Sequence, residues 1–136
     1  MESIVLDTDV ASLSFKRALP ASLLPHLIGR RPFITFATLG ELAKWADQRN
    51  WATPRRDRLN QWLSTIPVLP GTERVARTWG ELSAFAARRG RPRPQNDTWI
   101  AACCLAYEMP LATLNIKDFA DFATYEGLEL AGHAPD

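Results

Sequence analysis

The sequence has few of the residues that build disulfide frameworks, zinc sites or membrane spans. Its two cysteines, Cys103 and Cys104, are adjacent inside an apolar stretch, so we expect them to act as small hydrophobic residues and not to join distant segments. Its two histidines, His26 and His133, are isolated, and no Cys and His set for zinc is present. No apolar run reaches the roughly 18 residues that a membrane helix needs.

A leader segment and an excess of one charge are also missing. Residues 1–4 lack the basic segment and cleavage site of a secretory signal, so we expect a cytoplasmic protein. The net charge is only +1, which means that any affinity for nucleic acid must come from local basic patches. The 136 residues are 46% hydrophobic and 23% charged, as in globular proteins. We expect one domain over residues 1–132 and a loose tail at 133–136.

Short apolar segments alternate with amphipathic ones along the chain. Strands are predicted at residues 3–6, 33–36, 111–114 and 128–130, with a further short strand or extended linker at 68–69. Helices are predicted between residue 10 and Pro20, at 23–28, 38–46, 54–66 and 73–89, from 97 to the break at 109–110, and through 119–122. This alternation predicts an α/β fold with a central, mainly parallel sheet covered by helices on both faces.

Local patterns lead to three further expectations. Thr38 and Glu41 have the spacing of a capping box that begins a helix. Asn96 is expected to cap the apolar helix behind it, which leaves Asp97 free for another role. Four of the five tryptophans fall on apolar helix faces, and only Trp51 is expected to face solvent.

Five side chains with oxygen donors follow strand ends or begin the helices beside them. They are Asp7, Glu41, Asp97, Asn115 and Asp118. Because sites in open parallel sheets form outside the carboxyl ends of the strands, we expect these side chains to share one pocket. Clustered carboxylates raise one another's pKa unless a cation offsets their charge, and Mg²⁺ prefers such oxygen ligands. Taken singly, each acid could instead only cap a helix or face its dipole.

Four segments carry a family resemblance in their order and spacing. They are VLDTD at 5–9, Glu41 in a helix after a strand, NDTWIAA at 96–102, and LATLNIKDF at 111–119. Together they resemble the PIN-domain family, in particular its VapC-type toxin branch, over nearly the whole chain. The resemblance implies a three-layer α/β/α PIN-like fold. It also implies an endoribonuclease that uses Mg²⁺ or Mn²⁺ to hydrolyse RNA phosphodiester bonds, leaving a 5′-phosphate and a 3′-hydroxyl.

The resemblance also implies roles for single residues. Asp7, Glu41 and Asp97 correspond to the core metal-binding acids, with Asp118 as a fourth catalytic acid. Many family members have Asp where this chain has Asn115, so Asn115, Asp118 or both would complete the site, and one or two metal ions would fit. Two residues, Asp9 and Thr113, are expected to support the metal ligands through hydrogen bonds.

Partner surfaces are implied in the same way. VapC-type toxins pair with a VapB-like antitoxin whose C-terminal segment blocks the pocket, here over a groove formed by helices at 10–24 and 38–46. A homodimer is implied as well, with contributions from helices around 54–86. Four arginines precede Asp97 and are candidates to guide an RNA backbone, the alternative being a solvated loop: Arg88, Arg89, Arg91 and Arg93. Arg55, Arg56 and Arg58 form a second basic group with the same two readings.

Two other functions fit parts of the pattern. The Asp7–Val10 segment also fits the aspartyl nucleophile loop of haloacid-dehalogenase-like phosphatases. That class uses a later lysine and a Gly-Asp pair, and this chain offers Lys117 but no Gly-Asp pair. The other alternative is a non-catalytic PIN-like module that binds RNA or protein, which Asn115 in place of an acid leaves open.

Overall fold

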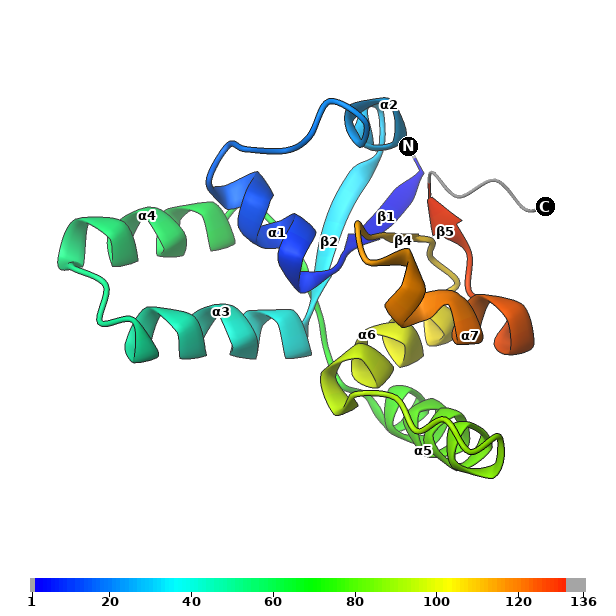
Figure 1. Ribbon diagram of the computed structural model, residues 1–136. Helices are drawn as coiled ribbons and strands as arrows, with labels where there is room; N and C mark the ends of the chain where they lie inside the picture. Colours follow the sequence, from blue (N-terminus) through cyan, green and yellow to red (C-terminus); the bar gives the residue numbers. More distant parts are fainter. Residues whose placement is uncertain (1, 132–136) are drawn as a thin grey trace.

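A computed structural model describes residues 2–131 of the chain (Figure 1). His133 and the tail expected at 133–136 lie outside the described residues. Along the described part, the elements are β1 (Ser3–Leu6), α1 (Thr8–Phe15), α2 (Leu24–Leu27), β2 (Arg31–Thr35), α3 (Phe36–Gln48), α4 (Thr53–Leu63), β3 (Val68–Leu69), α5 (Glu73–Arg88), α6 (Gln95–Ala106), β4 (Leu111–Ala112), α7 (Ile116–Glu126) and β5 (Leu130–Ala131). None of these helices combines the length and apolar character that a membrane crossing requires.

The five strands form one sheet in the order β3-β2-β1-β4-β5, and every pairing is parallel. The first strand is central, where Val5 lies opposite Phe33 of β2 and Leu111 of β4. The predicted α/β/α fold class with a parallel sheet is therefore confirmed. Because all strands run the same way, their carboxyl ends share one edge, and the helices that follow them begin there.

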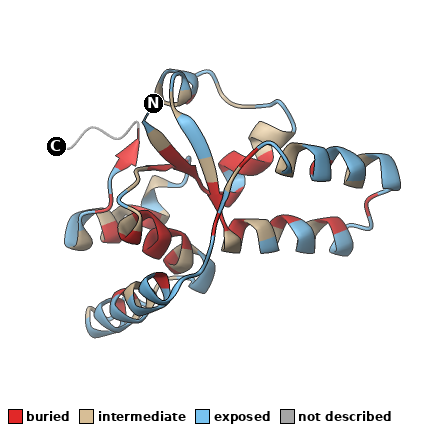
Figure 2. Ribbon diagram, turned by 180° about the vertical axis from the view of Figure 1, so that it is seen from behind, coloured by how far each residue is buried: buried red, intermediate tan, exposed pale blue. Residues whose placement is uncertain are grey.

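The side chains of the central strand alternate between two cores. Ile4 and Leu6 pack with apolar residues of α1, α3 and α4, whereas Val5 packs with residues of α5, α6 and α7. This alternation is the period of two of a strand that is covered on both faces. The buried residues accordingly concentrate in the strands and on the inner helix faces, while the outer faces of α4 and α5 are exposed (Figure 2).

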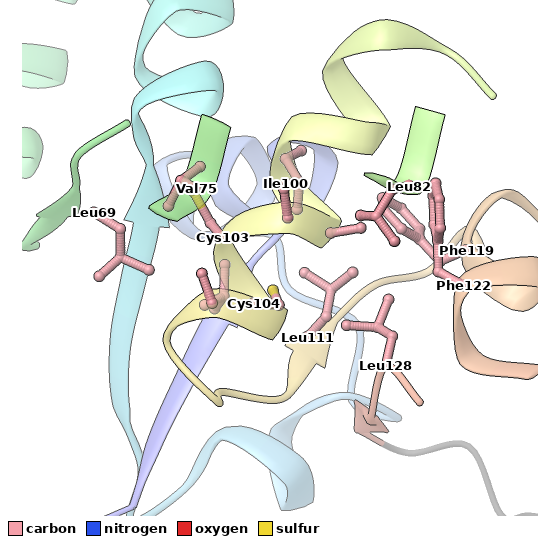
Figure 3. Close-up of a cluster of buried hydrophobic side chains, with 14 of the residues drawn as sticks. Leu69, Val75, Leu82, Ile100, Cys103, Cys104, Leu111, Phe119, Phe122 and Leu128 are labelled. Carbon is pink, nitrogen blue, oxygen red and sulfur yellow. The ribbon is translucent and has the colours of Figure 1, made fainter. Parts of the chain in front are cut away.

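The helix α6 is the most completely buried helix, and it carries both cysteines. Cys103 and Cys104 lie in one core with Val75, Leu111 and Phe122 (Figure 3). Burial raises the pKa of the Cys103 thiol to about 12 and that of Cys104 well above its usual value. Both thiols are therefore held protonated and unreactive, as small hydrophobic residues would be, which confirms the sequence expectation.

Two predicted helix starts are wrong. The cap of α3 is Thr35, whose hydroxyl accepts a hydrogen bond from the amide of Thr38 at 3.2 Å. The helix therefore begins at Phe36, which had been assigned to a strand, and Thr38 and Glu41 form no capping box. In α6 the cap position is Pro94 and the helix begins at Gln95. Asn96 is already inside the first turn and does not cap it.

Several element ends also differ from the prediction by a few residues. The helix α1 ends at Phe15, well before Pro20, because Arg17 adopts a left-handed conformation with φ +55° that no α-helix continues. The helix α4 ends at Leu63, and the last strand is β5 (Leu130–Ala131) in place of 128–130. Such shifts reflect local hydrogen bonds that apolar periodicity does not report.

The expectation that Trp51 faces solvent is wrong. Its side chain is only 7% exposed, and its ring stacks on Phe15 with centroids 6.0 Å apart. The guanidinium of Arg55 covers the ring at 3.9 Å, and the Nε of Arg56 donates to the Trp51 carbonyl at 2.7 Å. Asn50, with φ +51°, turns the chain after α3, directly before Trp51.

Replacing Trp51 by alanine should therefore lower the free energy of unfolding by roughly 3–5 kcal/mol, because a large buried side chain is lost. Urea unfolding followed by circular dichroism measures this change. Ile28→Ala is the control, since Ile28 is 75% exposed and its truncation should change stability by no more than about 0.5 kcal/mol. Equal effects of the two substitutions would contradict the placement of Trp51 in the core.

Candidate functional site

A small pocket of about 90 Å³ lies at the carboxyl edge of the sheet. It is lined by Asp7, Thr8, Asp9, Glu41, Asp97, Ile100, Asn115, Asp118 and Phe119. In Figure 1 the first turns of α1, α3, α6 and α7 gather around this edge. The structure thus brings together the five oxygen-bearing side chains that the sequence predicted to share one pocket, and adds Asp9 to them.

The carboxylate of Asp7 is the most deeply buried acid of the pocket. It caps α1, because its Oδ1 accepts a hydrogen bond from the amide of Val10 at 2.8 Å. Its Oδ2 accepts a second bond from the hydroxyl of Thr113 at 2.5 Å. Burial raises the pKa of Asp7 to about 6, the two hydrogen bonds lower it, and the charges of Asp9 and Asp97 raise it.

Thr113 links the two central strands at the pocket. Its hydroxyl donates to Asp7 and accepts a hydrogen bond from the amide of Asn115 at 2.9 Å. Thr113 is itself buried. The hydroxyl of Thr113 therefore fixes both the carboxylate of Asp7 and the backbone at the start of α7. A hydrogen bond from Thr113 to a candidate ligand is the contact expected from the sequence.

Glu41 lies in the second turn of α3, where the hydroxyl of Thr8 holds it and Thr38 in turn contacts Thr8. Thr8 donates its hydroxyl proton to Oε1 of Glu41 at 2.9 Å. Because that proton is used, the bond of 2.9 Å between Thr8 and Thr38 has Thr38 as its donor. Sequence reasoning missed both threonines as parts of the site. The only local signal was the position of Thr8, directly after Asp7.

Asp97 enters the pocket from the first turn of α6. Its pKa is raised to about 6, first by burial and then by the charges of Asp118 and Glu41, while the guanidinium of Arg93 lowers it. Asp7 and Asp97 therefore both have carboxyl groups whose charge is disfavoured where they stand. This is the electrostatic signature of acids that crowd one small volume.

Asn115 and Asp9 form a hydrogen-bonded pair at the rim of the pocket. The amide Nδ2 of Asn115 donates to Oδ2 of Asp9 at 2.6 Å. With its NH₂ group engaged there, the Asn115 side chain keeps its carbonyl oxygen as a neutral acceptor. Asp118 follows in the first turn of α7 and lines the same pocket.

Within residues 2–131, no three His, Cys, Asp or Glu side chains stand ready-arranged as a metal site. The hydrogen bonds above supply the reason. Both oxygens of Asp7, one of Glu41 and one of Asp9 accept hydrogen bonds from protein donors. Without a cation, repulsion between the remaining carboxylates favours such separate partners over convergence on one point.

The basic loop before Asp97 is largely occupied by pairs inside the molecule. Arg89 binds both carboxylate oxygens of Glu126, at 2.9 and 3.2 Å, and Arg91 binds Asp121 at 2.8 Å. These pairs join the loop to α7. Arg88 lies over the ring of Phe85 at 5.6 Å. Of the four arginines predicted to guide RNA, only Arg93 has a charge that lowers the pKa of Asp97.

Comparison with known proteins gives one family and several relatives. The model of the PIN domain family matches residues 4–125. Ribonuclease VapC1 of Haemophilus influenzae (strain R2866) is 30% identical over 100 residues, which are 73% of this chain and 72% of that protein.

Solved structures have the same fold. One is VapBC2 from Rickettsia felis bound to a DNA fragment from its promoter, with a TM-score of 0.79, 22% identity, and coverage of 94% of this chain and 96% of that one. Another is VapBC-5 from Mycobacterium tuberculosis, with a TM-score of 0.73, 26% identity, and coverage of 96% and 98%. In both, the likeness covers nearly the whole of each chain.

Crowding of the acids predicts how the stability of the metal-free protein depends on pH. The pKa of Asp7 and of Asp97, about 6, exceeds the ordinary value of 3.8, so the folded protein keeps protons that the unfolded chain has lost. Their contribution to the free energy of unfolding should therefore be full below about pH 4 and be lost as the pH rises through about 6.

Asp97→Asn tests this contribution. In EDTA at neutral pH, the substitution should raise the melting temperature by a few degrees, because it removes one repelling charge, and it should flatten the fall in stability between pH 4 and 6. The control is Glu81→Gln, an exposed acid of α5 outside the pocket. A lower melting temperature for Asp97→Asn would instead assign Asp97 to starting the helix.

The pairing of Arg89 with Glu126 predicts that Arg89 acts on stability. Arg89→Ala should lower the free energy of unfolding by roughly 1–3 kcal/mol, because it leaves the largely buried Glu126 carboxylate without its partner. Arg88→Ala is the matched control and should be nearly neutral, since Arg88 forms no ion pair within residues 2–131. Urea unfolding of both variants measures the difference. Equal stabilities would contradict the structural role of Arg89.

Proposed function

The chain belongs to the PIN domain family, and on that premise we propose that it is a divalent-metal-dependent endoribonuclease, the toxin of a VapBC-like toxin–antitoxin pair. One observation carries the proposal: the acids Asp7, Glu41, Asp97 and Asp118 line a single pocket of about 90 Å³ at the carboxyl edge of the sheet. The names of the relatives, a ribonuclease and toxin–antitoxin complexes, support the choice of reaction and partner.

The donor set of the pocket fits Mg²⁺ or Mn²⁺. All its candidate ligands offer oxygen, and among residues 2–131 no cysteine or histidine lines the pocket. The raised pKa of Asp7 and of Asp97 means that a positive charge placed between them would stabilise the ionised forms. When bound, a divalent cation supplies activated water and neutralises the charge that develops on a phosphate.

Residues in and beside the pocket would hold the cation or orient the residues that hold it. Asp7, Glu41 and Asp97 would hold the cation. Thr113 and the amide of Val10 fix the orientation of Asp7, and Thr8 fixes that of Glu41. No side chain needs to act as a covalent nucleophile, because water is the attacking group in this chemistry. The helix starts around the pocket add partial positive charge beside the acids and beside a phosphate.

For the fourth ligand we propose that Asn115 and Asp118 both contribute. The hydrogen bond from Asn115 to Asp9 leaves the carbonyl oxygen of Asn115 available to a cation. Asp118 supplies the negative charge that an aspartate at position 115 would have provided, and its charge already acts on Asp97.

The phosphatase alternative is disfavoured by the surroundings of Asp7. In that class the nucleophilic carboxylate works with a lysine and a Gly-Asp pair, and among the described residues that line the pocket around Asp7 there is no lysine and no glycine. Lys117, the lysine that this class would require, is exposed and does not line the pocket.

The second alternative is a non-catalytic binding module. If the chain were such a module, Mg²⁺ and Mn²⁺ would leave its melting temperature unchanged.

We further propose an antitoxin partner of the VapB type and a homodimer. The support for the antitoxin is that several solved structures with this fold are toxin–antitoxin complexes. The dimer, with its contacts from helices around 54–86, and the cytoplasmic location stay predictions from sequence.

Cleavage of RNA tests the proposed activity. The wild-type protein should cleave a mixed set of RNAs in Mn²⁺ or Mg²⁺ and not in EDTA, leaving 5′-phosphate and 3′-hydroxyl ends. Asp97→Asn should reduce the rate on the order of 100-fold or more, because one metal-binding acid is lost. Gel electrophoresis of end-labelled RNA measures both the rate and the ends.

Glu81→Gln is the control variant for the cleavage assay. It should keep the wild-type rate, since Glu81 lies on the exposed face of α5. Full activity of Asp97→Asn, or metal-independent cleavage by the wild-type protein, would overturn the proposed function.

A further inference from the structure

The acidic pocket poses a problem for a substrate that is itself negatively charged. RNA carries one charge per phosphate, and the pocket presents Asp7, Glu41, Asp97 and Asp118. The arginine loop beside it offers little compensation, because Arg89 and Arg91 are neutralised by acids of α7. Within residues 2–131 only Arg88 and Arg93 of this loop form no ion pair, so cations elsewhere on the surface are needed to add to the attraction for an RNA strand.

A groove of about 750 Å³ between the end of α1 and the helix α4 collects such cations. It is lined by Phe15, Lys16, Arg17, Arg55, Arg58, Gln61, Trp62 and Thr65. Four of these side chains are positively charged and none is acidic. Since the whole chain has a net charge of only +1, the groove is a local concentration of positive charge.

The four cations of the groove are not committed to acids. Within residues 2–131 no ion pair involves Lys16, Arg17, Arg55 or Arg58. In contrast to these, the neighbouring Arg56 does pair with Asp47 at 2.7 Å. Arg17 also holds a left-handed backbone with φ +55° at the lip of the groove, a conformation that costs energy in a residue other than glycine.

An aromatic cluster forms the floor of the groove. Phe15 stacks on Trp51 and meets Trp62 edge to face, with centroids 6.2 Å apart. Arg55 is held over the face of Trp51 at 3.9 Å. Phe15 and Trp62 are only partly buried, so a flat ring can reach them. Guanidinium groups beside partly exposed aromatic rings are the combination that binds single-stranded nucleic acid through phosphates and base stacking.

We propose that the groove between α1 and α4 binds a single-stranded segment of the RNA substrate, outside the acidic pocket. The inference rests on the proposed ribonuclease function. The helix α1 connects the two places, because it begins next to Asp7 in the pocket and ends at Phe15 in the groove. Its eight residues span about 12 Å, a distance that a few nucleotides cover.

Along α4 and the turn that follows it, the lining residues recur on one side. Arg55, Arg58, Gln61 or Trp62, and Thr65 follow at steps of three or four residues, over about 15 Å. Such a row of side chains offers successive contacts to the backbone of an extended RNA strand. The groove would then supply substrate affinity, whereas the pocket supplies the chemistry.

Binding without cleavage tests the groove directly. A fluorescein-labelled, unstructured RNA of about twelve nucleotides is titrated in EDTA, and its anisotropy is recorded at several salt concentrations. Arg55→Glu with Arg58→Glu should weaken binding at least 10-fold and reduce the salt slope by about 1.4, as expected for two lost phosphate contacts. Arg74→Glu with Arg77→Glu makes the same charge change on the exposed face of α5 and should weaken binding less than 3-fold.

A second pair of substitutions protects the test against misfolding. Arg55 covers Trp51, so its replacement can disturb the core as well as the groove. Lys16→Glu with Arg58→Glu changes the same charge and leaves this contact intact. Melting curves of all variants establish that they are folded, and the second pair should weaken RNA binding as the first does.

Each result decides for or against the groove. Equal RNA affinity of the groove variants and the α5 control overturns the inference. So does a pattern in which the groove variants keep RNA affinity but lose affinity for a labelled glutamate-rich peptide, which would assign the groove to an acidic protein segment. Wild-type cleavage in Mn²⁺ is measured in parallel, and groove variants should raise KM with kcat unchanged. Groove-dependent binding without any cleavage would refute the ribonuclease function and leave the groove as an RNA site.

Discussion

Thr113 and the amide of Val10 give the buried carboxylate of Asp7 two hydrogen bonds in place of water. Without them, a carboxylate at this depth would be forced to stay protonated. Thr113 uses the same hydroxyl to accept the amide of Asn115, so the end of β1, the end of β4 and the start of α7 are fixed together. The positions of Asp97 and Asp118 relative to Asp7 follow from this arrangement of central strands and helix starts.

The parts of the fold that sequence could predict are those governed by local pattern. Apolar runs located the central strand and the sheet, and the acids at strand ends pointed to one shared edge. Helix starts were less predictable, because Thr35 and Thr38 are equally plausible caps and only the path of the chain selects Thr35. Trp51 was misassigned because its burial depends on Phe15, which lies far away in sequence.

Contacts over long sequence distances explain the rest of what sequence could not give. Thr8 meets Thr38 across 30 residues and Glu41 across 33, so no local motif announces the hydroxyl pair that orients Glu41. Arg89 and Arg91 look available in sequence, but their acidic partners lie 37 and 30 residues further along. A basic run read in isolation overstates the positive charge that the folded surface offers. Within the described part of the chain, four cations that form no ion pair gather instead where α1 ends and α4 runs past it.

The hydrogen bond between Asp7 and Thr113 joins residues 106 positions apart. Closing so long a loop is slow and costly in entropy, and nothing nearer in the chain substitutes for it. No fragment that lacks β4 and α7 can assemble the pocket, and fraying of this segment would remove Thr113 and Asp118 together. Any activity of the pocket is therefore a property of the intact native state. Partly folded or proteolytically cleaved chains are inactive, so the measured activity is proportional to the number of native molecules.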